Sequence, residues 1–203
     1  MNGQEIEAKF FVKDLNRVEK RLHELKAQLF QARVHEVNLR FDNANGDLRR
    51  ELKVLRLRQD NEAKFTFKGP SRETAGGALS RKEIEFTVES FEAAKEFLEA
   101  LGFMPIIFYE KYRTTYELNG VHIMLDEMPY GNFVEIESED ADALQNVASL
   151  LGLNWNATVK AGYHALFERF ATKYNLQPDK LSFEALASVQ VKIGDMGIVY
   201  SDQ

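Results

Sequence analysis

The tripeptide Glu-Ile-Glu occurs three times in the chain, in the segments EIEAKF (5–10), KEIEFT (82–87) and VEIESE (134–139). Side chains two residues apart share one face of an extended strand, so each triplet places two carboxylates next to each other. Neighbouring like charges repel unless an opposite charge lies between them. Pairs such as Glu5 with Glu7 and Glu135 with Glu137 are therefore candidate ligands of a divalent cation, which prefers hard oxygen donors.

Basic residues show the same two-residue spacing in other strand-like segments. In VLRLR, Arg56 and Arg58 alternate with apolar residues, and in EKYR, Lys111 and Arg113 do so. Further basic residues at alternating positions are Lys9, Lys64, Lys68 and Arg81. Such pairs are typical of sites that bind oxyanions such as phosphate, because Arg can donate two parallel hydrogen bonds to them.

An exposed antiparallel sheet offers one explanation of this alternation, with one face packed on a core and the other in water. The residue types favour another, because exposed sheet faces usually carry Thr, Ser and Gln as well as charges. Here the polar faces hold almost only Glu, Lys and Arg. If the strands close into a ring with helices outside, both sets of charges point into one lumen. The natural ligand is then a polyphosphate with its metal ions.

Helical patterns follow the three triplets. The first begins at Asp14 and continues its apolar spacing to Leu29, and the others cover 90–102 and 140–152. Each begins with Ser or Asp, and the last two end at Gly. The alternating segments between them predict strands.

Four further elements are expected from turn and spacing signals. Asn119 and Gly120 predict a tight hairpin. Residues 71–78, which read SRETAGGA, predict a flexible loop. Apolar spacing predicts a C-terminal helix over 163–174, and LSFEALASV predicts a short one after it.

The composition is that of a globular protein, with 203 residues of which 44% are hydrophobic and 29% are charged. The net charge of −6 argues against general nucleic-acid binding. The absence of cysteine excludes disulfides and thiolate metal sites. The segment MNGQEIEAKF lacks the apolar region of a signal peptide, and no stretch approaches the roughly 18 apolar residues of a membrane helix. We therefore expect a cytoplasmic protein with no membrane partner.

The ordered set EIEAKF, VLRLR, FTFKGP, SRKEIEF, EKYR and LDEMPYGNFVEIE resembles the CYTH proteins, or triphosphate tunnel metalloenzymes. The resemblance covers roughly Glu5 to Phe170 and is greatest to the class IV adenylate cyclase branch, whose relatives include thiamine triphosphatases and tripolyphosphatases. It implies an α+β fold, an eight-stranded antiparallel closed tunnel (a β-barrel) with helices packed outside. The tunnel domain would span 1–171. The extension 172–203 would cap the tunnel or contribute to a homodimer.

The same resemblance implies roles for individual residues. It assigns the metal ions, Mg²⁺ or Mn²⁺, to Glu5, Glu7, Asp126, Glu135 and Glu137. It assigns the substrate phosphates to Lys9, Arg56, Arg58, Lys68, Arg81, Lys111, Arg113 and Tyr163. It places Glu5, Glu7, Lys9 and Lys160 in the catalytic set. One departure is NLRFD, where many relatives have Asp-x-Tyr-Phe-Asp. There Arg40 is interpreted as a surface residue, with a phosphate or base contact as the alternative.

The expected function is a metal-dependent cleavage of a small-molecule triphosphate. In the preferred reading the protein is like a class IV adenylate cyclase and converts ATP to cyclic AMP and pyrophosphate. The first alternative is hydrolysis of tripolyphosphate, thiamine triphosphate or a nucleoside triphosphate. The second is a non-catalytic module that binds polyphosphate or the 5′-triphosphate of an RNA.

Overall fold

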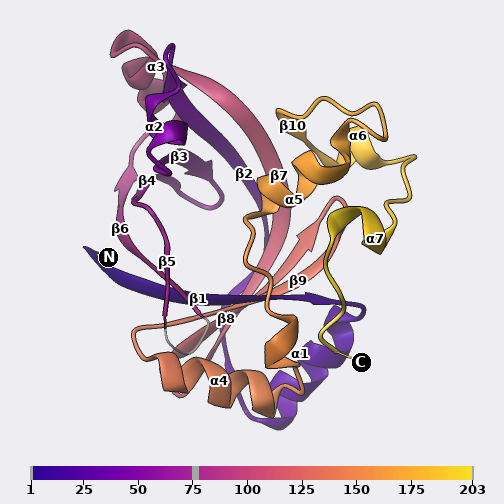
Figure 1. Cartoon of the computed structure of the whole chain (residues 1–203). Coiled ribbons are helices and arrows are strands. Elements are labelled where there is room, and N and C mark those ends of the chain that lie inside the picture. The colour runs from indigo at the N-terminus through magenta and orange to yellow at the C-terminus, as the bar shows by residue number, and fades with distance from the viewer. Residues whose placement is uncertain (1, 75–77, 203) are drawn as a thin grey trace.

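The computed structural model describes residues 2–74 and 78–202, and for residues 2–5 it describes the backbone alone. The strands are β1 (Asn2–Val12), β2 (Gln28–Asn43), β3 (Val54–Gln59), β4 (Ala63–Lys68), β5 (Arg72–Glu73), β6 (Leu79–Val88), β7 (Phe103–Leu118), β8 (Val121–Met128), β9 (Gly131–Ser138) and β10 (Lys180–Leu181). The helices are α1 (Leu15–Glu24), α2 (Asp47–Arg50), α3 (Phe91–Ala100), α4 (Ala141–Leu150), α5 (Tyr163–Ala171), α6 (Phe183–Leu186) and α7 (Ile193–Met196), with a 3₁₀ turn, η1 (Trp155–Ala157). Figure 1 shows their arrangement.

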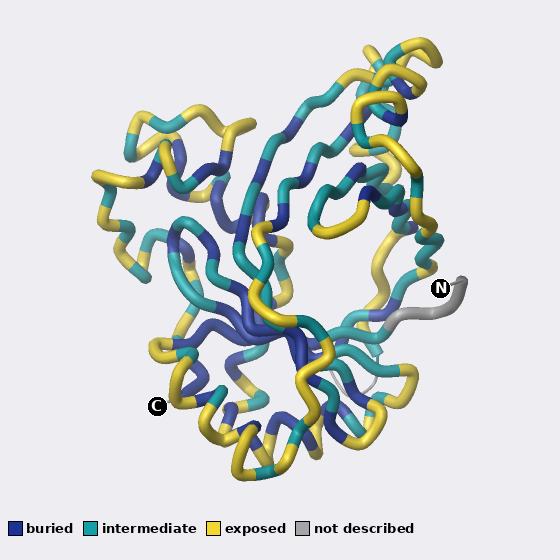
Figure 2. The backbone as a smooth tube through the Cα atoms, turned by 180° about the vertical axis from the view of Figure 1, so that it is seen from behind, coloured by how far each residue is buried: buried dark blue, intermediate teal, exposed yellow. Residues whose placement is uncertain are grey.

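Eight of the described strands form a closed antiparallel ring. Its order is β1-β9-β8-β7-β2-β3-β4-β6, and it closes because β1 also pairs with β6. Figure 2 shows the backbone arranged around a centre, with most of the exposed residues in the peripheral helices and turns. The short strands β5 and β10 add to β6 and β7. The expected α+β tunnel with helices outside is therefore confirmed.

The three strands that carry Glu-Ile-Glu are neighbours, because β1 lies between β6 and β9. The opposing Cα pairs include Glu5 with Arg81, Glu7 with Glu137 and Lys9 with Glu135. Each of these strands is followed by a helix, α1, α3 or α4. The repeated triplet thus marks one continuous wall of the ring, with β2 diametrically opposite β1 in the strand order.

Ring closure depends on the two longest strands, β2 and β7, which have 16 residues each. Their pairing contains three register shifts, the last between Arg40 and Phe41. Such irregularities bend a strand and increase its twist, which helps a sheet to curl into a closed form. The turn from β7 to β8 uses Asn119 and Gly120 with φ angles of 55° and 76°, as the hairpin prediction requires.

The outward faces of the strands are apolar and carry the helices. Helices α1 and α4 cover β1, β8 and β9 through a core that includes Leu22 and Ile136, both fully buried. Helix α3 covers β2 and β3 through Leu98 and Phe41. Because successive side chains of a strand point to opposite faces, the charged residues between these apolar ones point into the ring.

Helix α5 closes one end of the ring. Its Phe167 packs with Phe11 of β1 and Phe133 of β9 in a second apolar cluster. Phe11 and Phe133 share their strand faces with Lys9 and Glu135, since each pair is two residues apart. The inward surface therefore changes from charged to aromatic toward α5.

The first helix is shorter than its apolar spacing predicts. Helix α1 ends at Glu24, and Lys26 takes a left-handed backbone conformation with φ 59°. Leu29 lies in β2 and is 55% exposed, so its prediction as a helical residue was wrong. No Gly or Pro marks this helix end, unlike the ends at Gly102 and Gly152, where φ is 87° and 71° as expected.

The remaining element predictions met mixed outcomes. Residues 72–73 of the expected loop form β5, and residues 75–77 lie outside the described part of the chain. The predicted helix over 163–174 is α5, which ends at Ala171, and the short helix after it is α6. Among the described residues, no helix combines the length and apolar character needed to cross a membrane.

The C-terminal segment returns to the end of β1 and the beginning of α1. Ser201 N donates to Phe11 O at 2.8 Å, and Tyr200 stacks on the Phe11 ring at 4.7 Å. The Asp202 carboxylate accepts hydrogen bonds from the backbone nitrogens of Lys13 and Asp14 at 3.0 and 3.3 Å. The described residues that line the central cavity end at Tyr163, so the proposed capping role of 172–203 stays a prediction.

We predict that Asp202→Ala lowers the free energy of unfolding by about 1–3 kcal/mol, because two backbone donors lose a charged acceptor. Urea denaturation monitored by circular dichroism measures this. The matched control is Glu184→Ala in the same segment, whose side chain is 89% exposed, and which should change stability by less than about 0.5 kcal/mol. Equal stabilities of Asp202→Ala and wild type would contradict an anchoring role for this carboxylate.

Candidate active site

A cavity of about 380 Å³ occupies the centre of the ring. Its basic lining residues are Lys9, Arg40, Arg56, Arg58, Lys64, Lys68, Arg81, Lys111, Arg113 and Lys160. Its acidic lining residues are Glu7, Glu36, Asp60, Glu83, Glu85, Glu135 and Glu137. All the predicted phosphate-binding residues are brought together here, including Tyr163.

Three of the five predicted metal ligands line the cavity, namely Glu7, Glu135 and Glu137. The side chain of Glu5 lies outside the described residues, although its backbone is opposite Arg81. Asp126 is 0% exposed and is not part of the lining.

The wall built by β1, β6 and β9 pairs each cation with a carboxylate. Lys9 Nζ lies 2.9 Å from Glu135 Oε1, and Arg81 Nη2 lies 3.0 Å from Glu7 Oε1. Arg113 reaches Glu135 from β7. Predicted metal ligands and predicted phosphate ligands therefore neutralise one another across neighbouring strands.

Asp126 anchors two of the lining cations from behind. Arg113 donates to both its oxygens at 2.6 Å, and Lys111 donates to Oδ2 at 3.0 Å. The Tyr163 hydroxyl donates to the same oxygen at 2.6 Å, and Lys9 Nζ lies 4.3 Å from the centroid of the Tyr163 ring. Burial raises the pKa of Tyr163 well above its usual range, with Asp126 adding to the effect, so its hydroxyl keeps the proton that it donates.

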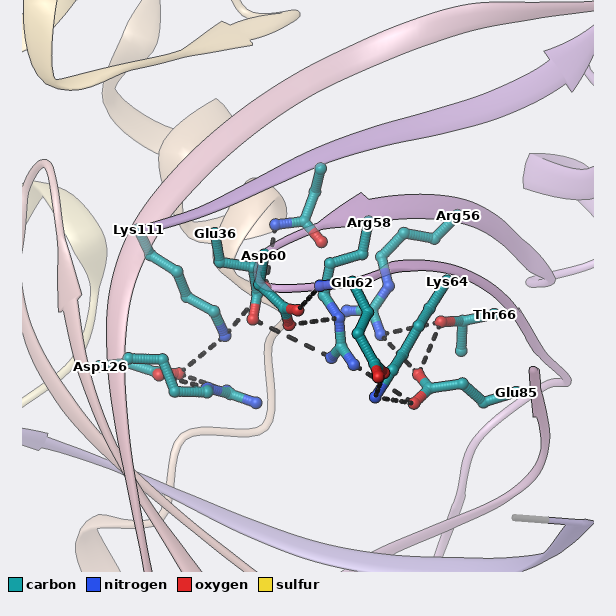
Figure 3. A network of polar contacts seen from close by, with 12 residues as sticks. Glu36, Arg56, Arg58, Asp60, Glu62, Lys64, Thr66, Glu85, Lys111 and Asp126 are labelled. Carbon is teal, nitrogen blue, oxygen red and sulfur yellow. Dashed lines mark hydrogen bonds and ion pairs between the residues drawn. The ribbon is translucent and has the colours of Figure 1, made fainter. Parts of the chain in front are cut away.

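A second network lies on the side of the cavity formed by β2, β3 and β4, and it includes Glu85 of β6 (Figure 3). Arg58 lies 3.2 Å from Glu85 and 3.4 Å from Asp60. Arg56 donates to Thr66 Oγ1 at 3.1 Å, and Thr66 donates in turn to Glu85 at 2.9 Å. These contacts fix the directions of both predicted phosphate-binding arginines.

Sequence reasoning missed Glu36, which is 1% exposed and lies 3.6 Å from Lys111 and 3.9 Å from Arg58. It also missed Asp60, Thr66 and Tyr109 as parts of these networks. The signal for β2 was present, because Glu36, Asn38 and Arg40 alternate with apolar residues.

The preferred surface interpretation of Arg40 was wrong, since its side chain lines the cavity.

Comparison with known proteins shows the family to which the chain belongs. The family model of the CYTH domain matches residues 3–151, which contain all eight strands of the ring. The chain belongs to the CYTH domain family. CYTH proteins typically act on triphosphates, and membership implies the use of a divalent metal ion.

Solved structures have the same fold. A candidate adenylate cyclase from Vibrio parahaemolyticus is 20% identical, with a TM-score of 0.69 over 80% of this chain and 97% of that one. A conserved hypothetical protein from Pyrococcus furiosus is 26% identical, with a TM-score of 0.65 over 78% and 97%. A candidate adenylyl cyclase from Hippeastrum, described as having a dominant triphosphatase activity, is 16% identical, with a TM-score of 0.61 over 85% and 97%. No curated protein sequence matches the chain.

The carboxylates of this CYTH domain suit a divalent metal in chemistry and position. Glu7 and Glu137 lie opposite each other on β1 and β9, and both line the cavity with Glu135. Their oxygens are the hard donors that Mg²⁺ and Mn²⁺ prefer. Within the described residues, no three acidic or His side chains already surround one point. Since Glu7 pairs with Arg81 and Glu135 with Lys9, a cation must take these carboxylates from basic partners.

Arginines on the wall formed by β3 suit an oxyanion. Arg56 and Arg58 both line the cavity, and each side chain is 12% exposed. A guanidinium group donates charge-assisted hydrogen bonds to phosphate oxygens. A phosphate in the cavity of this CYTH domain can therefore accept from both side chains.

The charges inside the CYTH ring hold two buried carboxylates ionised. Burial alone would raise the pKa of Glu135, but Lys9, Arg113 and Lys111 hold it well below its usual range. Burial opposes Lys111, Arg113 and Arg58 in the same way at Glu36, and the net effect is a lowered pKa. Because the folded pKa of each group lies below the unfolded value, each stabilises the fold above about pH 4.3 and loses that contribution as pH falls.

We predict that Glu36→Gln destabilises the protein by about 3–5 kcal/mol at pH 7, because Lys111 and Arg58 lose a buried partner. The difference from wild type should shrink by about 1–2 kcal/mol between pH 7 and pH 3, as the unfolded carboxyl takes up its proton. Chemical denaturation at both pH values measures this, with the partly exposed Glu99→Gln on α3 as the control. A difference that stays constant with pH would contradict the lowered pKa of Glu36.

Proposed function

We propose that this CYTH protein is a divalent-metal-dependent enzyme that binds a linear triphosphate in its central cavity and cleaves it as a class IV adenylate cyclase does. The reaction converts ATP to cyclic AMP and pyrophosphate. The observation that carries the proposal is the convergence of Lys9, Arg56, Arg58, Lys68, Arg81, Lys111 and Arg113 with Glu7, Glu135 and Glu137 in one enclosed space.

The basic residues bind and orient the phosphates. Arg56 and Arg58 line the cavity from β3 and present their guanidinium groups on one wall. Lys9 and Arg113 approach from the other side, where Asp126 and Tyr163 hold Arg113 and its neighbour Lys111 in place. Hydrogen bonds between charged partners contribute about 1.5–3 kcal/mol each, so several of them can hold a triphosphate in a single extended register.

The acidic residues Glu5, Glu7, Glu135 and Glu137 are the proposed metal ligands. A divalent cation bound there supplies positive charge next to the phosphate oxygens and offsets the charge that develops on them. The roles of the chain itself are to present these carboxylates from neighbouring strands and to keep bulk water out. For Asp126 we propose an anchoring role rather than direct ligation, because both its oxygens already accept hydrogen bonds from Arg113.

A nucleotide is favoured by an aromatic surface at the edge of the cavity. Phe30 lines the cavity although it is 66% exposed, and its ring lies edge-on to His122 at 5.0 Å. An exposed aromatic pair beside a phosphate site can stack on a base. In the cyclase reaction the ribose 3′-hydroxyl then gives its proton to solvent and its oxygen forms a bond to the α-phosphorus. The bond from that phosphorus to the bridging oxygen breaks, and pyrophosphate leaves with the electron pair.

Hydrolysis is the second candidate, with water in place of the 3′-hydroxyl. The fold neighbour from Hippeastrum with a dominant triphosphatase activity favours it. The phosphate contacts serve both reactions equally, because they hold the chain of phosphates and not the nucleophile. A module that only binds polyphosphate or an RNA 5′-triphosphate would need the basic residues but not the acidic wall.

We expect the purified protein with Mg²⁺ or Mn²⁺ to release pyrophosphate and cyclic AMP in equal amounts from ATP. Chromatography of the products from ATP, tripolyphosphate and thiamine triphosphate measures this directly. Inorganic phosphate without cyclic AMP would replace the cyclase proposal by the hydrolase one. Tight binding without any metal-dependent product would leave only the binding module.

We expect Glu7→Gln to abolish turnover, by at least about a hundredfold, while the protein stays folded, because a neutral amide is a poor ligand for a hard cation. Product formation at saturating Mg²⁺ or Mn²⁺ and circular dichroism measure the two parts of this statement. Glu24→Gln, a half-exposed residue of α1 that pairs with Arg21, serves as the control and should keep wild-type activity. Near wild-type activity of Glu7→Gln would contradict the assignment of Glu7 as a metal ligand.

A further inference from the structure

Arg40 has a distinctive place on the cavity wall. It lies on β2, where its Cα partner on one side is Arg56 of β3 and on the other is Ile107 of β7. Ile107 belongs to the apolar cluster built on α5, so Arg40 lies toward the closed end of the ring. Its side chain lines the cavity from the wall opposite the carboxylates of β1 and β9.

Arg40 differs from the other basic lining residues in lacking a counter-ion. Each of the others has a carboxylate within 4.0 Å, as Arg56 has in Glu85. Among the described residues, the Arg40 guanidinium forms no hydrogen bond and no ion pair. The nearest acidic candidate, Glu168 of α5, is taken by Arg49 at 2.9 Å.

The surroundings of Arg40 are unfavourable for an isolated cation. Burial lowers the pKa of its guanidinium, and although Tyr109 opposes this, Arg49 and Arg56 lower it further. An arginine does not give up its proton in a protein, so the charge stays and calls for an anion. Removing a cation from water without a partner is destabilising, so the partly buried Arg40 guanidinium favours a bound anion.

The position of Arg40 relative to Arg56 indicates which anion. Opposed side chains on paired strands have Cβ atoms about 4.5–5.5 Å apart, so two arginines there can contact the same phosphate group. Both arginines line the cavity. A phosphate bound between them would give the Arg40 guanidinium a counter-ion.

We infer that Arg40 is a further phosphate-binding residue and that Arg40 and Arg56 grip one phosphate group of the substrate between them. This inference rests on the proposed triphosphate function. It assigns to β2 a direct contact with the ligand, in addition to the arginines of β3. It also orients the substrate, since that phosphate lies toward α5 and away from the exposed Phe30.

The test measures the dissociation constant of tripolyphosphate by calorimetry, with Mg²⁺ present, for Arg40→Gln, Arg56→Gln and the double variant. The matched control is Arg33→Gln, an arginine of the same strand that pairs with Glu127 and does not line the cavity. We expect Arg40→Gln to weaken binding about tenfold to a hundredfold, as loss of a charge-assisted hydrogen bond does. If Arg40 and Arg56 contact the same phosphate, their effects on the dissociation constant should not be independent. The factor by which the double variant weakens binding should then differ clearly from the product of the factors for the two single variants.

Thermal unfolding without ligand separates a binding role from a structural one. Neutralising an unpaired cation should leave the melting temperature of Arg40→Gln unchanged or raise it, whereas a structural residue would lower it. Unchanged affinity in Arg40→Gln together with weaker binding in Arg56→Gln would overturn the inference and leave the proposed function intact. Losses that multiply would overturn the shared phosphate. Unchanged affinity in both single variants would instead overturn the triphosphate site itself.

Discussion

The pairing of β1 with β6 is the contact on which the rest of the site depends. Without it the charged faces of eight strands would lie in water, where like-charged neighbours are screened and hydrated. With it they share one enclosed space, and each ion needs a partner because burial of an unpaired charge is costly. The described cavity meets this demand internally, through pairs such as Lys9 with Glu135 and Arg81 with Glu7. The pattern of opposite signs on neighbouring strands is thus a condition of folding as well as of binding.

Because the lining residues form ion pairs with one another, a ligand that binds in this cavity must compete with those pairs. A phosphate that contacts Lys9 competes with Glu135 for the same ammonium group, and a cation that contacts Glu135 competes with Lys9. Each ligand alone would release one member of a buried pair and leave it without a partner. Both together replace every protein–protein ion pair that they break. Phosphate and metal should therefore assist each other's binding through the chain's own ion pairs, even without a direct contact between them. The inferred Arg40 contact is free of this competition, because no described residue forms an ion pair with Arg40.

The alternation of polar and apolar residues predicted most of the residues that line the cavity. It could not predict which of the charged side chains lie buried behind the lining. The short strands β3 and β4 could be predicted because Arg56 and Arg58, and Lys64, Thr66 and Lys68, stand at every second position. The end of α1 and the start of β2 were misread, because positive φ at Lys26 has no sequence signal and Leu29 fits both periods. Asp126 has the spacing of a lining residue, yet its oxygens are turned to Arg113, Lys111 and Tyr163. That outcome depends on α5, which is distant in sequence and contributes Tyr163.

Specificity for the organic group must arise outside the phosphate-binding interior. The inward positions of β3, β4 and β6 are occupied by charges that bind one another, and the inward positions near α5 are occupied by Phe11, Phe133 and other aromatic residues. The parts of the lining that remain are at the exposed edge, where the beginning of β2 contributes Phe30 and β8 contributes His122. Exposed residues of this kind can change without breaking a buried ion pair, so the tunnel can keep its grip on phosphates while the group attached to them differs. In the proposed function, cyclase and hydrolase chemistry therefore use the same interior, and the organic group is selected at this edge.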